Sequence, residues 1–282
     1  MSGPRLIIID GYPKRVRDKL VEDGATVAGF LYEQTLKSCR NDIICDVVFP
    51  ADPGVSLPTG ASLKSYDGAV WTGSAISVRN IDDAEVRQQI DFARAVFEAG
   101  VEGFGSCFAI QIATVAAGGS VVRNPKGREV GIGRGLTLTD AGRTHPIFAG
   151  RADAFEAAMI HEDMVDSLPS GGVVLVENDM CPVQGAAFPT GKSKFTGVQY
   201  HPEFHLAELG AILWRQRKAL IREEFYKDAD GVRSVADDMI TLGHEPDRLD
   251  LREKMGVHGD LLDDNIRLNE VRNWINGLKP RT

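Results

Sequence analysis

The sequence predicts an α/β fold in which helices flank a central, mostly parallel sheet and a helical C-terminal extension follows. Three observations lead to this prediction. The first two hundred residues alternate apolar runs of strand length with amphipathic stretches of helical period. The apolar runs are continuous, as expected of parallel strands that helices cover on both faces. After residue 205, the chain is charged, helically periodic and poor in strand patterns.

The predicted strands are short and are bounded by turn-forming or polar residues. One begins at Val101, and the others are LIIID (6–10), IICDVVF (43–49), GAVWTG (68–73), TLTD (137–140), VVLVEN (173–178), AAFP (186–189) and FTGVQY (195–200). The clearest helix covers residues 82–99, because Asp82 or Asp83 can cap its start and Gly100 can end it. Its apolar residues on one face are Val86, Ile90, Ala93 and Phe97.

These patterns predict one domain over residues 1–205 and a helical extension over residues 206–282. The last helical segment, 261–278, has an apolar stripe, which predicts packing either on the core or on a second copy of the chain in a homo-oligomer. The stripe consists of Leu262, Ile266, Leu268, Val271, Trp274, Ile275 and Leu278.

The overall composition excludes several kinds of partner. A net charge of −8 without a Lys/Arg tract argues against nucleic acid or an anionic membrane. No apolar run approaches the roughly 20 residues that cross a bilayer, and the apolar run near the start is shorter than a signal-peptide core. The four cysteines form no CxxC pair, so we expect a reducing, cytoplasmic location.

The segment GFGSCFAIQIATVAAGG (103–119) is the first that indicates chemistry. A strand ends at Gly105, and a helix of small residues begins at Cys107, which is the layout of a nucleophile elbow. The N-terminus of a helix favours the thiolate form of a cysteine placed there. On this segment alone, a buried cysteine that fills space is the simpler interpretation.

A second segment, FTGVQYHPEFH (195–205), makes catalysis the better interpretation. In an extended backbone His201 and Glu203 point to the same side, and Pro202 favours an extended His201. A carboxylate bonded to one imidazole nitrogen fixes the tautomer and leaves the other nitrogen to take a thiol proton. Cys107, His201 and Glu203 therefore fit a catalytic triad.

Four stretches, in order over roughly residues 5–205, together resemble class I glutamine amidotransferases, in particular free-standing members of the GMP-synthase-like or γ-glutamyl-hydrolase-like kind. GSCFAIQ (105–111) is similar to their G-x-C-x-G-x-Q signature, and VQYHPEF (198–204) to their His-x-Glu segment. DGAVWTGSAISV (67–78) resembles their oxyanion strand and loop. HEDMVDSLP (161–169) resembles the segment near their glutamine site.

This resemblance implies a role for each matching residue. Cys107 would be the nucleophile, His201 the general base and later the acid, and Glu203 the carboxylate that orients His201. The oxyanion would lie between backbone N–H groups, and neighbouring residues would hold the γ-glutamyl group, without any metal or organic cofactor. The oxyanion donors would be Phe108 and either Gly73 or Ser74, and the γ-glutamyl site would include Gln111, Glu162 and Asp163.

Two positions depart from the family pattern. Ala109 stands where the signature has glycine, and its extra methyl group predicts a small adjustment of the helix against the strand. The loop 72–75 lacks the family's second glycine and its proline, which leaves the second oxyanion donor open.

Other motifs carry less weight. GKS (191–193) ends like a phosphate loop, but Ala186 stands where the first glycine belongs and no helix pattern follows. His201 and His205 have metal-ligand spacing only on a helix, which Pro202 disfavours, so no metal is expected. His161 fits a pocket wall or a structural role better than a catalytic one.

The predicted function is Cys-dependent hydrolysis of the γ-amide of glutamine or of a small γ-glutamyl amide or peptide. A γ-glutamyl thioester would form, and ammonia or an amine would leave. One alternative is a glutaminase subunit that supplies ammonia to a separately encoded synthetase or ligase. Another is a catalytically silent binding scaffold, against which the complete set of Cys107, His201 and Glu203 argues.

Overall fold

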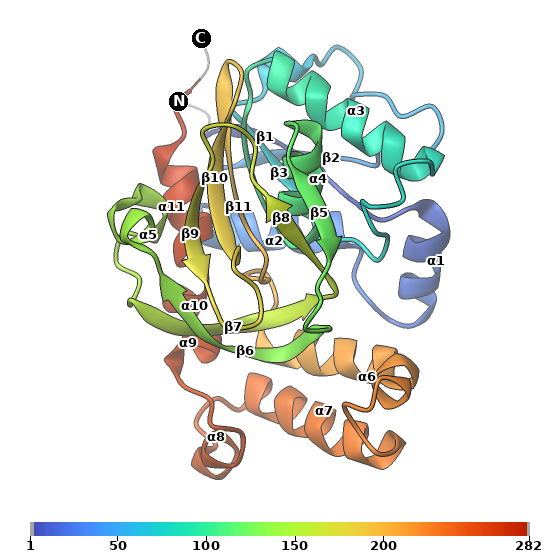
Figure 1. Ribbon diagram of the computed structural model, residues 1–282, viewed down its shortest axis with the longest axis vertical. Helices are drawn as coiled ribbons and strands as arrows, with labels where there is room; N and C mark the ends of the chain where they lie inside the picture. The colour runs from blue at the N-terminus through green and yellow to red at the C-terminus, as the bar shows by residue number, and fades with distance from the viewer. Residues whose placement is uncertain (1–2, 281–282) are drawn as a thin grey trace.

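The computed structural model describes residues 3–280. Residues 1–2 of the expected range 1–205 and residues 281–282 of the expected range 206–282 lie outside it. Its strands form one large sheet and one small one (Figure 1). They are β1 (Arg5–Ile9), β2 (Ile44–Val48), β3 (Gly68–Trp71), β4 (Glu102–Ser106), β5 (Ser120–Arg123), β6 (Glu129–Leu138), β7 (Ala154–His161), β8 (Asp163–Ser167), β9 (Val173–Glu177), β10 (Gly185–Thr190) and β11 (Ser193–Val198).

The large sheet has the order β2-β1-β3-β4-β11-β10-β9-β6-β7, and β5 pairs with β8 in the small one. The five strands from β2 to β11 are parallel. Beyond them every pairing is antiparallel, so β10 and β6 run opposite to the rest. Within residues 3–280, seven of the nine strands therefore point the same way, and the predicted fold class is confirmed.

Helices cover both faces of the parallel half (Figure 1). Successive side chains of a strand point to opposite faces of the sheet. In β1, Ile7 and Ile9 therefore pack with α3 and α4 on one face. Leu6 and Ile8 pack with α2 and α11 on the other. The helices are α1 (Lys14–Glu22), α2 (Ala28–Cys39), α3 (Ala84–Glu98), α4 (Phe108–Ala116), α5 (Asp140–Thr144), α6 (Leu206–Arg222), α7 (Ala229–His244), α8 (Leu249–Met255), α9 (Gly259–Leu262), α10 (Asp264–Arg267) and α11 (Asn269–Gly277), with 3-10 turns η1 (Leu63–Ser65) and η2 (Pro146–Phe148).

The helix predicted over 82–99 is α3, and its boundaries follow from local chemistry. The Asp83 side chain accepts a hydrogen bond from the Glu85 N–H at 2.9 Å, which caps the first turn. The chain turns away at Gly100, whose φ of 70° suits a residue without a Cβ. All four apolar residues expected on its inner face are buried.

Five strands differ from the sequence prediction. The sequence patterns did not predict β5, β7, β8 and most of β6, because polar residues or small ones such as glycine and alanine dilute their apolar runs. In addition, β2 is not covered on both faces as its apolar run predicted. It lies at one edge of the large sheet, and its Ile44 is 48% exposed.

The C-terminal helices pack in two places. Helices α6 to α9 form an apolar cluster of their own against β7, and Figure 1 shows α6 and α7 side by side below the sheet. Helix α11 instead returns to the main core, where the Trp274 ring stacks on Phe104 of β4 at 5.5 Å between centroids. Of the two expected packing partners for the tail, the structure shows the core.

The expected single helix over 261–278 is broken into α9, α10 and α11. Asp263 ends α9, and its side chain accepts a hydrogen bond from the Asn265 N–H, which starts α10. The break turns Ile266 out of the predicted stripe, so that it is 38% exposed, whereas Trp274 is 4% exposed. In the part of the chain that the structure describes, no helix is long and apolar enough to span a membrane.

We predict that Trp274→Ala destabilises the protein by about 3–5 kcal/mol, because it removes a buried ring and leaves a cavity beside Phe104. The measurement is the free energy of unfolding in denaturant. Ile266→Ala is the matched control and should change that free energy by less than about 1 kcal/mol. Equal losses in the two variants would contradict the packing described here.

Candidate active site

Cys107 occupies the sharp turn between β4 and α4. Its backbone has φ 55° and ψ −107°, a conformation that costs energy for any residue with a side chain. The Cys107 N–H donates to the Val198 carbonyl at 2.8 Å, which ties the turn to β11. Its Sγ lies 3.4 Å from the Ile160 carbonyl oxygen. The predicted elbow is therefore present, with the cysteine at the N-cap of α4.

Gly105 and Ala109 allow this elbow to form. A Cβ on Gly105 would meet both the Cβ of Ala109 and the Trp71 carbonyl at less than any normal contact distance. The extra methyl group at Ala109 thus fits because Gly105 has none. The space for the Ala109 methyl group comes from Gly105 of β4, which lies beside Trp71 of β3.

His201 reaches the elbow because β11 pairs with β4, placing Val198 opposite Ser106. The His201 Nδ1 lies 2.7 Å from Glu203 Oε1, where a ring N–H donates to the carboxylate. The two side chains meet within a turn, in which the Phe204 N–H bonds back to the His201 carbonyl. The extended backbone expected at 201–203 is therefore wrong, although the predicted pair forms.

The environment of His201 favours its protonated form. Burial alone would lower its pKa, but the electrostatic influence of Glu203 and Cys107 beside the ring outweighs burial and raises the pKa to about 10. The ring also stacks on Phe204 at 4.2 Å between centroids. Within residues 3–280, the His201 Nε2 has no hydrogen-bond partner.

A buried chain of hydroxyl groups holds Glu203 in place. The Ser106 hydroxyl donates to Glu203 Oε1 at 2.8 Å, and the Tyr32 hydroxyl donates to Ser106 Oγ at 2.9 Å. Ser106 and Tyr32 are both fully buried. Glu203 Oε1 therefore accepts from a hydroxyl and from His201 together, and the carboxylate has one fixed orientation.

A cavity of about 200 Å³ opens over the elbow. Seven of the residues singled out from the sequence line it: Ser74, Cys107, Phe108, Gln111, Glu162, Asp163 and His201. The other two, Gly73 and Glu203, lie behind this lining and contact His201. Gly73 is so close that a Cβ on it would lie 2.9 Å from the His201 ring, and Glu203 bonds the His201 Nδ1.

One end of the cavity is fixed by hydrogen bonds to the turn between β7 and β8. Gln111 Nε2 donates to the Asp163 carbonyl at 3.0 Å and to Gln199 Oε1 at 3.2 Å. His161 is a wall residue here, since its ring nitrogens contact the Asp163 carbonyl at 3.0 Å and Glu129 Oε2 at 3.1 Å. Burial raises the pKa of Glu129, but hydrogen bonds with groups including His161 outweigh it and lower that pKa.

Several lining residues were not identified from the sequence. Tyr12 and Arg79 follow β1 and β3 at the carboxyl edge of the sheet, where ligands of such folds bind, so their position was a usable signal. Arg128 and Gln216 come from the start of β6 and from α6. No local pattern marks them, because only tertiary packing brings them to the cavity.

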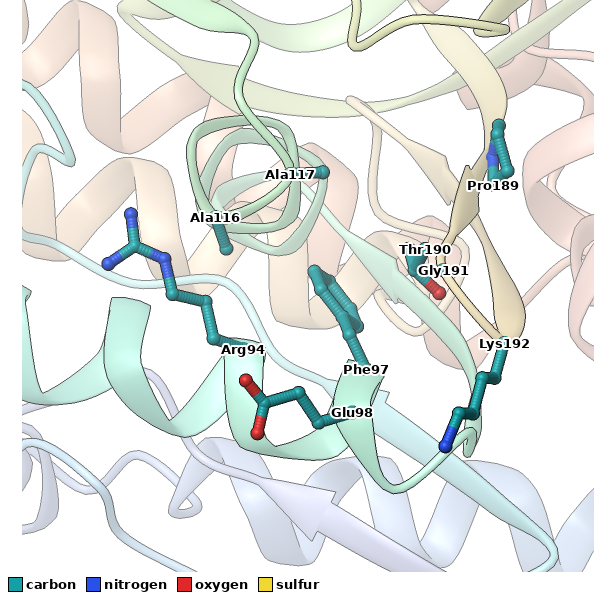
Figure 2. Close-up of a pocket in the computed structure, with 9 residues that line it drawn as sticks. All are labelled: Arg94, Phe97, Glu98, Ala116, Ala117, Pro189, Thr190, Gly191 and Lys192. Atoms are coloured by element: carbon teal, nitrogen blue, oxygen red, sulfur yellow. The ribbon is translucent and has the colours of Figure 1, made fainter.

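A larger groove, of about 700 Å³, lies elsewhere (Figure 2). It runs between α3, α4 and the β10–β11 hairpin and contains Arg94, Glu98 and Lys192, but not Cys107, His201 or Glu203. GKS (191–193) begins in the turn of that hairpin. Within residues 3–280, no cluster of His, Cys, Asp and Glu side chains could hold a metal ion.

Residues 36–218 match the glutamine amidotransferase class-I family, and the chain belongs to that family. It is 31% identical to the γ-glutamyl-L-1-hydroxyisopropylamide hydrolase of Pseudomonas sp., a match that covers 99% of this chain and 94% of the relative. These matches confirm the family predicted from the sequence and the prediction of an amidohydrolase-type enzyme.

Two further similarities place the chain among its relatives. GMP synthase of Clostridium novyi is 29% identical, over 58% of this chain but only 29% of the synthase. The structure of a glutamine amidotransferase from Methylobacillus flagellatus superposes with a TM-score of 0.65 at 18% identity, covering 100% of this chain and 98% of that one. The structural similarity supports the fold.

We predict that Gly105→Ala disrupts the elbow, since its methyl group would meet the Trp71 backbone and Ala109. Overpacking against backbone costs at least about 1–3 kcal/mol, which thermal unfolding would detect. Gly277→Ala is the control, because a Cβ there meets nothing within 4 Å. A Gly105→Ala protein as stable as the control variant would argue against this packing.

Proposed function

We propose that this enzyme hydrolyses γ-glutamyl amides of small amines, with Cys107 as the nucleophile. The observation that carries the proposal is the strained Cys107 next to a buried His201–Glu203 pair. The match with a γ-glutamyl amide hydrolase over nearly the whole of both chains supports this type of substrate.

The proposed reaction has two halves. The Cys107 thiolate attacks the γ-carbonyl carbon, and His201 gives its proton to the departing amine nitrogen as the C–N bond breaks. A γ-glutamyl thioester remains on Cys107. His201, now neutral, takes a proton from water, which attacks the thioester and releases glutamate and the thiolate. The raised pKa of His201 supports its role as the proton donor.

Two features would stabilise the transition state. Phe108 is the first residue of α4, so its N–H lies outside the hydrogen-bond ladder of the helix and is available to an oxyanion. We propose Gly73 or Ser74 as the source of the second N–H group. Ser106 and Tyr32 would act as positioning residues, because they fix the carboxylate that orients His201.

The catalytic unit would span residues 1–205, with Gln111, Glu162 and Asp163 around the γ-glutamyl group. The extension from residue 206 would contribute Gln216 to the wall of the cavity. The four unpaired cysteines support a cytoplasmic location.

A second candidate is a glutaminase subunit that passes ammonia to a separate synthetase. The similarity to GMP synthases favours it, although this chain covers only 29% of the length of the Clostridium novyi protein. A hydrolase turns over substrate as a purified chain, whereas a subunit requires its partner for full rate. Amine release by the isolated chain therefore separates the two functions.

Cys107→Ala should reduce amine release from γ-glutamyl amides by at least about 1,000-fold, because the nucleophile is lost. His201→Ala should be similarly inactive, and Glu203→Ala should retain more activity, because it removes only the orienting group. The measurement is amine release across a panel of γ-glutamyl amides, with circular dichroism to verify folding. Near wild-type release by a folded Cys107→Ala protein would overturn the proposal.

The pH dependence should report the His201–Glu203 pair. Because His201 must be protonated to release the amine, activity should persist at neutral pH and fall as the pH rises through about 10. In Glu203→Gln the charge that raises the His201 pKa is absent, so this alkaline limb should move to lower pH by about one unit or more.

The measurement is kcat/KM between pH 6 and 11. Glu98→Gln removes a carboxylate from the remote groove of Figure 2 and should leave the limb in place. If the limb also stayed in place in Glu203→Gln, His201 would not be the titrating acid.

A further inference from the structure

Among the residues that the structure describes, two arginines line the cavity above Cys107, and one of them has donors free for a ligand. All three guanidinium nitrogens of Arg128 are engaged, with the two carboxylate oxygens of Glu223 and with Gln216 Oε1. Its Nη2 also lies 3.6 Å from Glu162, and the side chain is 16% exposed. Arg128 is thus a fixed part of the wall.

Arg79 is held at one side and open at the other. Its Nε donates to Asp163 Oδ1 at 2.8 Å. The Ser77 hydroxyl donates to the other oxygen of Asp163 and accepts from the Arg79 N–H at 3.2 Å. Within residues 3–280, the two Nη atoms make no hydrogen bond, and the side chain is 39% exposed.

Arg79 lies at the same end of the cavity as Gln111. Asp163 connects the two, since its carbonyl accepts from Gln111 and its carboxylate from Arg79. Gln111 is one turn into α4 from Cys107. A substrate whose γ-carbonyl rests at Cys107 and whose chain runs along this wall therefore carries its α-carbon toward Arg79.

We propose that Arg79 binds the α-carboxylate of the γ-glutamyl substrate, an inference that rests on the proposed hydrolysis at Cys107. Two parallel N–H groups of a guanidinium match the two oxygens of a carboxylate. Asp163 orients the guanidinium before the substrate arrives, which reduces the entropy lost on binding. The enzyme then selects γ-glutamyl compounds with a free α-carboxylate over glutamine side chains within a peptide.

The charges of the lining agree with such a substrate. Glu162 and Asp163 are the carboxylates there, against Arg79 and Arg128. The head of a γ-glutamyl compound is itself a zwitterion, with an α-ammonium and an α-carboxylate, so a lining with both signs suits it. Glu162 is already paired with Arg123, and of the two arginines Arg79 is the one whose Nη atoms remain free within residues 3–280.

The test compares two substrates that differ only at the α-carbon. One is a γ-glutamyl amide with a free α-carboxylate, and the other is its neutral α-carboxamide. Each is assayed for amine release with the wild type, Arg79→Met and Arg79→Lys. Arg94→Met, an arginine in the remote groove of Figure 2, is the matched control.

In Arg79→Met, kcat/KM for the carboxylate substrate should fall roughly 10- to 100-fold, with little change for the carboxamide. Arg79→Lys should lie between, since it keeps the charge and loses the paired donors. An equal loss on both substrates would reduce Arg79 to a support for Asp163 and overturn the proposal. An unchanged preference for the carboxylate would overturn it as well.

A binding measurement separates this inference from the proposed function. Calorimetry on Cys107→Ala, with and without Arg79→Met, compares the affinities for the same two compounds without turnover. If the wild type released no amine, the hydrolysis would be wrong, and a carboxylate preference that depends on Arg79 would still support the binding role. Active enzyme whose carboxylate preference survives Arg79→Met would reject the binding role alone.

Discussion

The close packing of α4 against the end of β4 is the constraint on which the site depends. Gly105 brings the helix and β3 together at a distance that no side chain would allow. That approach forces Cys107 into a strained backbone conformation and places it at the N-terminus of α4. The energy for this strain comes from the buried apolar residues of β3, α3 and α4, which pack together in one cluster.

The position of Cys107 is also linked to the buried charge of Glu203. Glu203 is buried, and a buried carboxylate is costly unless hydrogen bonds and an opposite charge compensate it. Ser106 and His201 supply both on the same oxygen. Ser106 directly precedes Cys107 in the chain. The segment 106–107 therefore positions the Cys107 Sγ and, through the Ser106 hydroxyl, also holds the Glu203 carboxylate that bonds His201.

The elbow and the His201–Glu203 pair could be predicted because each is contiguous in sequence, and so could the central strands, which are continuously apolar. The reason given for the pair was wrong, since a turn and not an extended strand brings His201 to Glu203. Tyr32, Ser106 and Gln216 depend on which distant elements meet, and no local pattern encodes that. The strands β5, β7 and β8 were missed because their apolar runs are short or diluted by polar and small residues.

The cavity is completed by a helix that lies outside the parallel part of the sheet. Gln216 lines the wall from α6, and Arg128 binds Gln216 and, just beyond the end of that helix, Glu223. Substitutions of Gln216 in α6 would therefore change the wall of the cavity without altering the elbow or its strained turn. The side of the cavity that α6 forms can thus be reshaped independently of the turn that carries Cys107.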